Sequence, residues 1–296
     1  MPGLELLVPS KMMVKAVVLG AGGQLGSEIM RVMPDAVGLT HDDQSVTDAA
    51  GVERVMLQHH PQVVFNCAAY NAVDRAENEP ELAHQVNADG AAAAASACRR
   101  HGARLVHFST NFVFDGSLGR PYTERDSARP LSVYGRSKLD GEHAVLELLP
   151  DALVIRAAAI FGDRGSAIKG GSFPGRIVER ALRRERLRVV SDQRVNPTYA
   201  RDLAQAAITL AASEMSGLVH VVADGCCSWD EFARATLAVC GLDAEVEAVT
   251  SAELAAPASR PLNGCLGSVR TAPLRPWREG LAEWAANRTA VEPRSQ

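Results

Sequence analysis

Tyr134 and Lys138 are four residues apart in the segment Tyr134-Gly-Arg-Ser-Lys138, a spacing that places both side chains on one face of a helix. An ammonium beside a phenol favours the phenolate and lowers a phenol pKa that is ordinarily about 10. Such a pair can exchange a proton with a substrate oxygen near neutral pH. The same spacing is common on solvated helices, so it indicates chemistry only if the chain supplies a partner and a cofactor.

Thr110 is a candidate partner for this pair. It follows Ser109 at the end of an apolar segment that we expect to be a strand, 24 residues before Tyr134. From the carboxyl end of that strand its hydroxyl can bond the carbonyl oxygen that Tyr134 would protonate. Thr110, Tyr134 and Lys138 are therefore predicted to surround and stabilise one developing alkoxide.

A glycine-rich loop near the start of the chain is a candidate cofactor site. Gly20-Ala-Gly-Gly23-Gln24-Leu25-Gly26 directly follows the first predicted strand and opens the first predicted helix. Glycines in this place permit a tight turn, close approach of the backbone to a pyrophosphate, and close packing of helix on strand. The helix N-terminus then presents unpaired N–H groups to the phosphates. The loop predicts dinucleotide binding.

Two further segments bear on the cofactor. Asp42 follows the second predicted strand, where a carboxylate can bind the ribose hydroxyls, and no arginine stands there to hold a 2′-phosphate. This favours NADH over NADPH, although a solvated acidic turn is an equal alternative. After the third predicted strand, Ala68-Ala69-Tyr70 offers small residues over which a cofactor can lie.

Strands and helices alternate in the order that these sites require. We expect strands at Val14–Gly20, Ala36–Leu39, Val63–Asn66, Leu105–Ser109 and Leu153–Arg156. Helices are expected from the glycine loop to about Met33, from Thr47-Asp48 to about His60, at Pro80–His101 and at Val133–Leu149. This alternation predicts an α/β fold of the Rossmann type, with a doubly wound parallel sheet.

The second half of the sequence is less regular. It contains a helix before a strand at Leu187–Val190, a helix from Arg201, a strand at Leu218–Val222, a helix from Trp229, a proline-rich loop at Pro257–Pro276 and a last helix at Trp277–Asn287. We interpret residues 1–13 as an N-terminal extension and 14–156 as the dinucleotide-binding core. Residues 157–296 are expected to mix a small, discontinuous substrate-binding lobe with segments that complete the core.

The composition fits a soluble, cytoplasmic protein. Of 296 residues 47% are hydrophobic and 22% charged, and the net charge of -4 argues against a nucleic-acid partner. The arginine-rich run Arg180–Arg188 also contains glutamates and is expected to be a solvated helix face. No apolar run approaches the roughly 20 residues of a membrane helix. The six cysteines lack CxxC spacing and are expected to be reduced thiols, and no histidine pattern indicates a metal site.

Longer motifs make the chain resemble the extended short-chain dehydrogenases/reductases, and among them the dTDP-4-dehydrorhamnose reductase family. The matching segments run in the family's order from residue 15 to about 270, and include GAGGQLG, PQVVFNCAAYNAVDRAENEP, STNFVFDG, YTERDSARPLSVYGRSKLDGE and SDQRVNPTYARDLA. The resemblance implies NADH or NADPH and reduction of the 4-keto group of a nucleotide-activated deoxysugar. A homodimer is compatible with it.

The resemblance also implies roles for particular residues. Thr110, Tyr134 and Lys138 would be the catalytic triad, with Tyr134 as the proton donor and Lys138 holding the ribose. The hydride would pass from the nicotinamide to C4 of the sugar. The cofactor site would comprise Gly20, Gly23, Gln24, Leu25, Gly26, Asp42, Ala68, Ala69, Tyr70 and Asn87, together with Tyr134 and Lys138.

Departures from the family pattern fall on the substrate side. Asn111 and Phe112 replace the acid and tyrosine of the usual STDYVFDG, and Ala159 stands where the family usually has tryptophan. Val195 replaces a glycine, and Asn263-Gly264 replaces the usual N-S. These positions predict an altered, wider sugar pocket around Asn111, Phe112 and Ala159.

Two other functions use the same cofactor. A nucleotide-sugar epimerase or dehydratase would retain NAD⁺, but a dehydratase needs an acidic pair where this chain has Asn111 and Phe112. A regulatory subunit could bind the dinucleotide without turnover. The complete Thr110, Tyr134 and Lys138 set favours the reductase.

Overall fold

The computed structural model describes residues 14–164 and 171–291, with side chains described as far as residue 288. The extension expected at residues 1–13 lies outside this range. The central element is a six-stranded sheet in the order β10-β5-β4-β3-β1-β2, and every pairing within it is parallel. Its strands are β1 (Ala16–Leu19), β2 (Val37–Leu39), β3 (Val63–Asn66), β4 (Arg104–Thr110), β5 (Leu153–Ala157) and β10 (Gly217–His220). The predicted α/β fold is confirmed.

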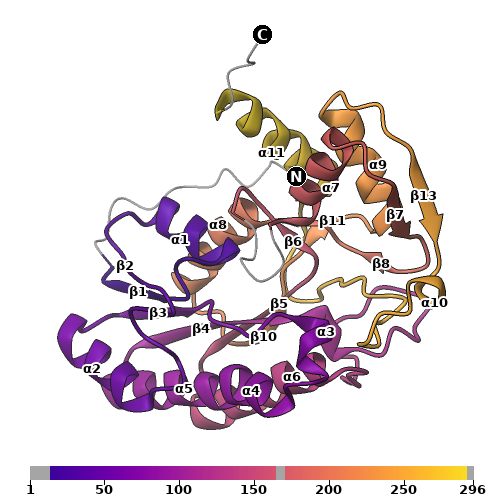
Figure 1. Cartoon of the computed structure of the whole chain (residues 1–296). Helices are drawn as coiled ribbons and strands as arrows, with labels where there is room; N and C mark the ends of the chain where they lie inside the picture. Colours follow the sequence, from indigo (N-terminus) through magenta and orange to yellow (C-terminus); the bar gives the residue numbers. More distant parts are fainter. Residues whose placement is uncertain (1–13, 165–170, 292–296) are drawn as a thin grey trace, which may run out of the picture.

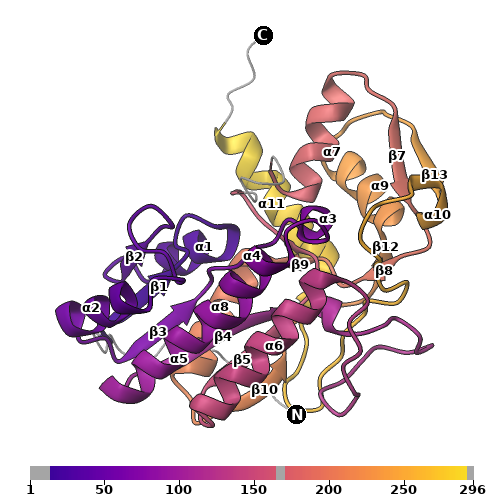
Figure 2. The same cartoon turned by 60° about the horizontal axis from the view of Figure 1, so that its bottom comes forward.

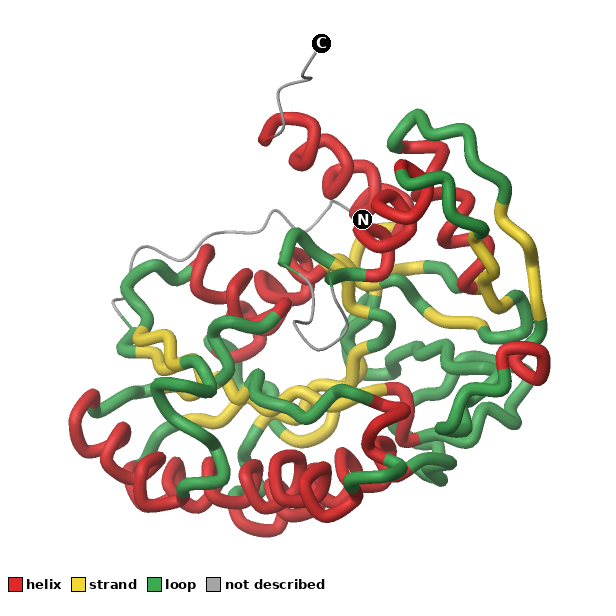
Figure 3. The backbone as a smooth tube through the Cα atoms, viewed as in Figure 1, coloured by secondary structure: helices red, strands yellow, loops and turns green. Residues whose placement is uncertain are grey.

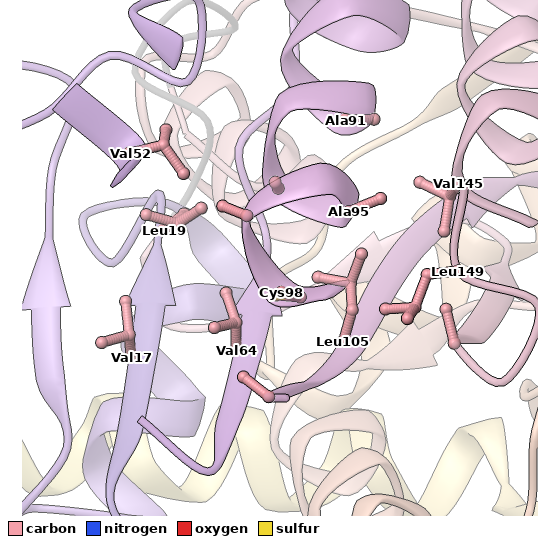
Figure 4. Packing of buried hydrophobic residues seen from close by; sticks show 14 of the residues in the cluster. Val17, Leu19, Val52, Val64, Ala91, Ala95, Cys98, Leu105, Val145 and Leu149 are labelled. Carbon is pink, nitrogen blue, oxygen red and sulfur yellow. The ribbon is translucent and has the colours of Figure 1, made fainter. Parts of the chain in front are cut away.

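Helices cover both faces of this sheet (Figures 1 and 2). One face packs against α2 (Ala49–His59), α5 (Gly90–His101) and α6 (Val133–Leu148), and the other against α1 (Gln24–Val32) and α8 (Ala200–Ala211). Figure 4 shows the first layer, where Val64 and Leu105 from the strands meet Ala95 and Val145 from the helices. Because both faces are buried, the strands read as apolar runs rather than alternating patterns.

The helix expected at Pro80–His101 is continuous but contains a π-helical turn. It consists of α4 (Pro80–His84), a π-helical turn η1 (Gln85–Asp89) and α5, which follow one another without a break. A π turn adds one residue to the helical repeat and is frequent at functional sites. Here the turn carries the buried Asn87, whose amide reaches across to a neighbouring loop. The alanine-rich segment that follows the turn favoured one regular helix, and helix propensity does not distinguish a π turn from an α turn.

The second half both completes the core and builds a lobe beside it. α8 and β10 belong to the core. A second lobe, which is predicted to bind the substrate and is called the substrate-side lobe below, contains α7 (Phe173–Leu182), β7 (Leu187–Val190), α9 (Trp229–Val239), β13 (Val246–Val249) and α10 (Ser251–Leu254). β7 and β13 pair in parallel, and Figure 3 shows them apart from the central sheet. The helix α11 (Trp277–Val291) packs against α9. The division of the chain at residue 156 stays a prediction.

Short elements fasten the connections between these parts. α3 (Val73–Ala76) and the 3-10 turn η2 (Asn111–Val113) follow β3 and β4. The two-residue strands pair as β6 (Ile160–Phe161) with β9 (Thr198–Tyr199), and β8 (Arg194–Val195) with β12 (Cys227–Ser228). β11 (Ala223–Asp224) pairs with β14 (Leu274–Pro276), which lies at the end of the expected proline-rich loop. None of these short elements has enough residues to show a periodic pattern.

The structure corrects the expectation that all six cysteines are reduced. Cys226 and Cys265 form a disulfide; their Cα atoms are 6.1 Å apart, and their positions in the sequence differ by 39. Cys67, Cys98, Cys227 and Cys240 are free. Spacing could not show this pairing, because folding brings together two loops that the sequence separates.

Across the described part of the chain, no helix is both long and apolar enough to span a bilayer.

Candidate active site

A cavity of about 870 Å³ lies between the carboxyl end of the central sheet and the substrate-side lobe. Ligands bind at this edge in open α/β sheets because the loops there leave strand ends and helix N-termini exposed. The structure brings three groups of expected residues to the cavity wall: Gly23, Gln24, Leu25 and Ala69 from the cofactor loops, the Thr110, Tyr134 and Lys138 set, and Asn111, Phe112 and Ala159.

The predicted catalytic set is assembled from β4 and α6. Thr110 is the last residue of β4, and Tyr134 and Lys138 occupy the first turns of α6. Ser132 caps this helix by accepting a hydrogen bond from the Gly135 N–H at 3.1 Å, which fixes where the helix begins. The Thr110 hydroxyl lies within hydrogen-bonding reach of the Tyr134 hydroxyl and also donates to Asn111 Oδ1 at 3.3 Å. Two hydroxyls therefore meet at one place on the cavity wall.

The pKa of Tyr134 departs from expectation. Burial raises it, and the hydrogen bond from Thr110 offsets only part of that effect. The predicted lowering by Lys138 is wrong for this structure, because the Lys138 ammonium points to the Phe108 carbonyl, to which it donates at 2.7 Å. A raised pKa keeps the phenol protonated at neutral pH, which is the state that a proton donor needs.

Lys138 is a buried cation beneath this site. Only 2% of its surface is exposed, and burial lowers its pKa to about 8. Glu142, one helical turn further along α6, opposes this shift. An amine with a pKa close to neutral exchanges its proton readily, so Lys138 suits a site of proton transfer.

The glycine loop fits a dinucleotide. Gly20 has φ +76°, and the N–H groups of Gly20 and Ala21 bind the Leu39 carbonyl at 2.8 and 3.0 Å. A Cβ at Gly26 would lie 2.3 Å from the Gly20 carbonyl oxygen, so this turn admits no side chain. The Gln24 Nε2 amide is buried at the start of α1 and finds no hydrogen-bond partner in the described residues. That donor and the α1 N-terminus can serve a pyrophosphate.

The remaining expected cofactor residues lie behind the cavity wall. Asn87 accepts from the Tyr70 N–H at 2.9 Å and donates to the Tyr70 carbonyl at 3.0 Å and to Ser137 Oγ at 2.9 Å, which ties the β3 loop to α6. The Tyr70 hydroxyl donates to Glu79 at 2.6 Å. Ala68 backs Gly20, because a Cβ on Gly20 would lie 2.7 Å from the Ala68 nitrogen. Direct cofactor contacts by these residues, by Gly20 and by Gly26 stay predictions.

Asp42 and Asp43 are both exposed, and the side chain of Asp43 is anchored. The Asp43 carboxylate accepts from the Thr40 N–H at 2.9 Å and from the Thr40 hydroxyl at 2.7 Å. These bonds lower the pKa of Asp43 and keep it ionised. The Thr40 side chain in turn lies 3.4 Å from the place of a Cβ on Gly22. The fixed negative charge at the end of β2 therefore belongs to Asp43.

The expected substrate residues have unequal roles. Asn111 is buried, and its amide donates to the Gly264 carbonyl at 3.0 Å, so it joins the end of β4 to a distant loop. The Phe112 ring meets the Tyr134 ring edge-on at a centroid distance of 5.4 Å. Ala159 has φ +42°, a left-handed conformation that non-glycine residues seldom adopt, and it lines the cavity.

Several cavity residues were not predicted from the sequence. The run Arg180–Arg188 is mostly exposed as expected, but it is not a helix face, because α7 ends at Leu182 and β7 begins at Leu187. The first and last residues of the run line the cavity. Arg176 joins them there, and burial together with the charge of Arg180 lowers its pKa. Trp229 also lines the cavity, with its ring 4.7 Å from that of Phe173. In the sequence, only the many arginines of this segment could have indicated a site for an anionic ligand.

The described residues contain no cluster of three or more histidine, cysteine, aspartate or glutamate side chains that could hold a metal ion. The polar groups on the cavity wall are mostly hydroxyls, amides and cations, with the Asp74 carboxylate among them. This set suits an organic, anionic ligand rather than a resident metal.

Comparisons with known proteins agree with this geometry. The family model described as RmlD substrate binding domain matches residues 14–290. The dTDP-4-dehydrorhamnose reductase of Mycobacterium tuberculosis is 41% identical over 95% of this chain and 96% of its own length. The dTDP-4-keto-6-deoxy-D-glucose reductase of Streptomyces niveus is 35% identical over 90% of this chain and 94% of its own.

A solved structure gives the same result in three dimensions. The dTDP-4-dehydrorhamnose reductase of Bacillus anthracis in complex with NADP superposes with a TM-score of 0.88 at 31% identity, covering 92% of this chain and 99% of that one. The match includes both the core and the lobe. The chain therefore belongs to the dTDP-4-dehydrorhamnose reductase family of the extended short-chain dehydrogenases/reductases.

Proposed function

We propose that the protein is an NAD(P)H-dependent reductase of the 4-keto group of a dTDP-linked deoxysugar. The observation that carries the proposal is the meeting of the Thr110 and Tyr134 hydroxyls on a cavity wall, with the glycine loop on the same cavity. Relatives named for two different dTDP-4-ketosugars support the substrate class. We expect the enzyme to act in the cytoplasm.

The residues of the chain supply a proton and a place for the carbonyl. A bound nicotinamide supplies the hydride. Thr110 donates a hydrogen bond to the carbonyl oxygen and holds it next to Tyr134. Tyr134, protonated because burial raises its pKa, transfers its proton to that oxygen as negative charge develops there. Lys138 keeps a positive charge beneath the site below pH about 8.

The lobe offers a site for the anionic part of such a substrate. Arg176 and Arg180 face the cavity from α7, where burial and, to a smaller extent, the charge of Arg180 lower the pKa of Arg176. A diphosphate placed near them can accept bidentate hydrogen bonds from guanidinium groups. Trp229 provides an aromatic surface next to these cations.

The direct test is oxidation of NADH or NADPH in the presence of dTDP-4-dehydrorhamnose and dTDP-4-keto-6-deoxyglucose. We expect turnover of at least one of them, together with release of the 4-hydroxy sugar. If neither is reduced while another carbonyl compound is, the sugar assignment is wrong. If the protein retains NAD⁺ and interconverts sugars without consuming cofactor, it is an epimerase.

The anchored Asp43 leads to a prediction about the cofactor. A carboxylate at the end of β2 can accept from a ribose 2′-hydroxyl and repels a 2′-phosphate, so NADH should bind more tightly than NADPH. Asp43→Asn should improve the affinity for NADPH relative to NADH by about tenfold. Asp42→Asn is the matched control and should leave the ratio unchanged. Equilibrium titrations with NADH and NADPH measure the ratio of the two affinities. Equal affinity ratios for the two variants would contradict the role of Asp43.

A further inference from the structure

Two buried polar residues stand side by side in the otherwise apolar strands β3 and β4. Asn66 and His107 are register partners, and they are 2% and 1% exposed. Burial of a polar side chain costs free energy unless the side chain forms hydrogen bonds. Two buried polar side chains at the centre of the sheet therefore indicate a specific role. The proton transfer described above does not use either side chain.

The hydrogen bonds of Asn66 determine where the proton of His107 lies. Asn66 Oδ1 accepts from the Ala68 N–H at 3.3 Å, so its Nδ2 is the atom that faces His107 Nδ1, at 3.2 Å. The reverse amide orientation would set two N–H donors against each other. Since an amide NH₂ only donates, His107 Nδ1 must accept. Burial holds the pKa of His107 well below its usual value, so the ring is neutral and carries its proton on Nε2.

That N–H points toward Lys138. His107 Nε2 lies 3.5 Å from Lys138 Nζ, which donates to the Phe108 carbonyl at 2.7 Å. An N–H can donate to a neutral amine, but it presents its positive end to an ammonium. The 3.5 Å between the two nitrogens is long for a hydrogen bond, as expected when two donors face each other. Loss of a proton from Lys138 would turn this contact into a proper hydrogen bond.

The other groups around Lys138 act differently. Glu142 favours the ammonium from the next turn of α6. Cys67 also faces Lys138, but burial raises the pKa of its thiol so far that it carries no charge near neutral pH. Tyr134 lies one turn earlier on the helix and is protonated. His107 is therefore the neighbour that favours the amine by its geometry rather than by its charge.

We propose that Asn66 and His107 are positioning residues for the reaction: Asn66 fixes the ring tautomer of His107, and His107 stabilises the amine form of Lys138. The inference rests on the proposed function, because it describes the same site. Each reduction leaves Tyr134 without its proton. To restore the phenol, Lys138 turns from the Phe108 carbonyl toward Tyr134 and gives up an N–H proton. The amine that remains turns back and accepts a hydrogen bond from His107 until water returns the proton.

Nuclear magnetic resonance of the cofactor-free protein tests this without any turnover. The chain has four lysines and eight histidines, so labelled lysine and histidine give few signals. Lys138→Arg and His107→Gln identify the two signals by their loss. We expect the His107 ring to be neutral with its proton on Nε2 from pH 6 to 9, and Lys138 to titrate near pH 8. A proton on Nδ1 in the unmodified protein would overturn the proposal.

Asn66→Asp reverses the hydrogen-bond direction with little change of shape. A carboxylate at position 66 accepts from Nδ1–H, so the ring proton moves and Nε2 becomes an acceptor for the ammonium. The Lys138 titration should then shift upward by at least about one pH unit. If the Lys138 titration shifts upward while the ring proton stays on Nε2, the shift is a charge effect alone and contradicts the proposal. A ring proton that moves to Nδ1 without any shift of the Lys138 titration would contradict it as well.

Kinetics of the active enzyme provide a second readout. In His107→Gln the side-chain amide can accept from Asn66 and present an N–H to Lys138, so kcat should stay close to that of the unmodified enzyme. His107→Leu can do neither and should lower kcat about tenfold with little change in KM. Equal kcat values for the two variants would contradict the role of His107. If no nucleotide sugar is turned over at all, the proposed function fails, while the titration of Lys138 still decides the present inference.

Discussion

Tyr134→Phe should lower kcat/KM for ketosugar reduction about a thousandfold while leaving the affinity for NADH nearly unchanged. A positioned general acid typically contributes between about a hundredfold and ten-thousandfold, and Tyr134 is the protonated group on the cavity wall that hydrogen-bonds to Thr110. The substitution removes one oxygen and keeps the ring against Phe112, so the cavity retains its shape. Steady-state kinetics together with equilibrium titration of NADH measure both quantities.

Tyr199→Phe is the matched control for this experiment. Tyr199 is also buried, and its hydroxyl accepts only a long bond of 3.4 Å from Asn287 in the described structure. It precedes α8 in the core and does not line the cavity. Its variant should retain activity. If Tyr134→Phe stays within tenfold of the unmodified enzyme, the proton comes from another group and the assignment of Tyr134 is wrong.

Glu142→Ala should lower the free energy of unfolding by about 3–5 kcal/mol. Glu142 lies beneath the active site, where it accepts hydrogen bonds from Ser109 and from Arg156, the latter at 2.8 and 2.5 Å. Glu142 and Arg156 are 2% and 4% exposed. Removing the carboxylate leaves the Arg156 guanidinium charged and without its counter-ion in the interior, and that desolvation penalty accounts for most of the loss. Urea denaturation provides the measurement.

An exposed ion pair provides the control. Glu185 pairs with Arg180 at 3.0 Å, with both side chains about two-fifths exposed, so Glu185→Ala should change the stability by less than about 1 kcal/mol. A double variant, Glu142→Leu with Arg156→Met, should lose less than Glu142→Ala because it leaves no unpaired charge. A loss for Glu142→Ala no greater than that for Glu185→Ala would show that the buried pair does not stabilise the fold.

The local features of this protein could be read from its sequence because each depends on neighbours within a few residues. The apolar runs that became β3 and β7 have the expected bounds, and the glycine loop joins β1 to α1 as predicted. The placement of Tyr134 and Lys138 on one face follows from helical spacing alone. Thr110 was found because strands of a parallel sheet end at one edge.

Contacts between distant segments were decided only by the tertiary structure. Asn111, predicted to be a substrate residue, lines the cavity, and its amide also binds the Gly264 carbonyl 153 residues away. Asn87 holds the Tyr70 backbone rather than lining the cavity. Arg176 reaches the same cavity from α7, a helix that the sequence did not connect with the cofactor loop. No local pattern encodes such meetings, because they depend on how the layers pack.

The same division applies to the electrostatics of the site. The sequence placed an ammonium one helical turn from a phenol, and the expected consequence was a lowered phenol pKa. In the folded protein Lys138 turns toward β4 and bonds to Phe108, so burial dominates and the pKa of Tyr134 rises. The residues that we propose for the chemistry thus followed from spacing, whereas their protonation states required the dielectric environment and hydrogen-bond directions that only the packed interior defines.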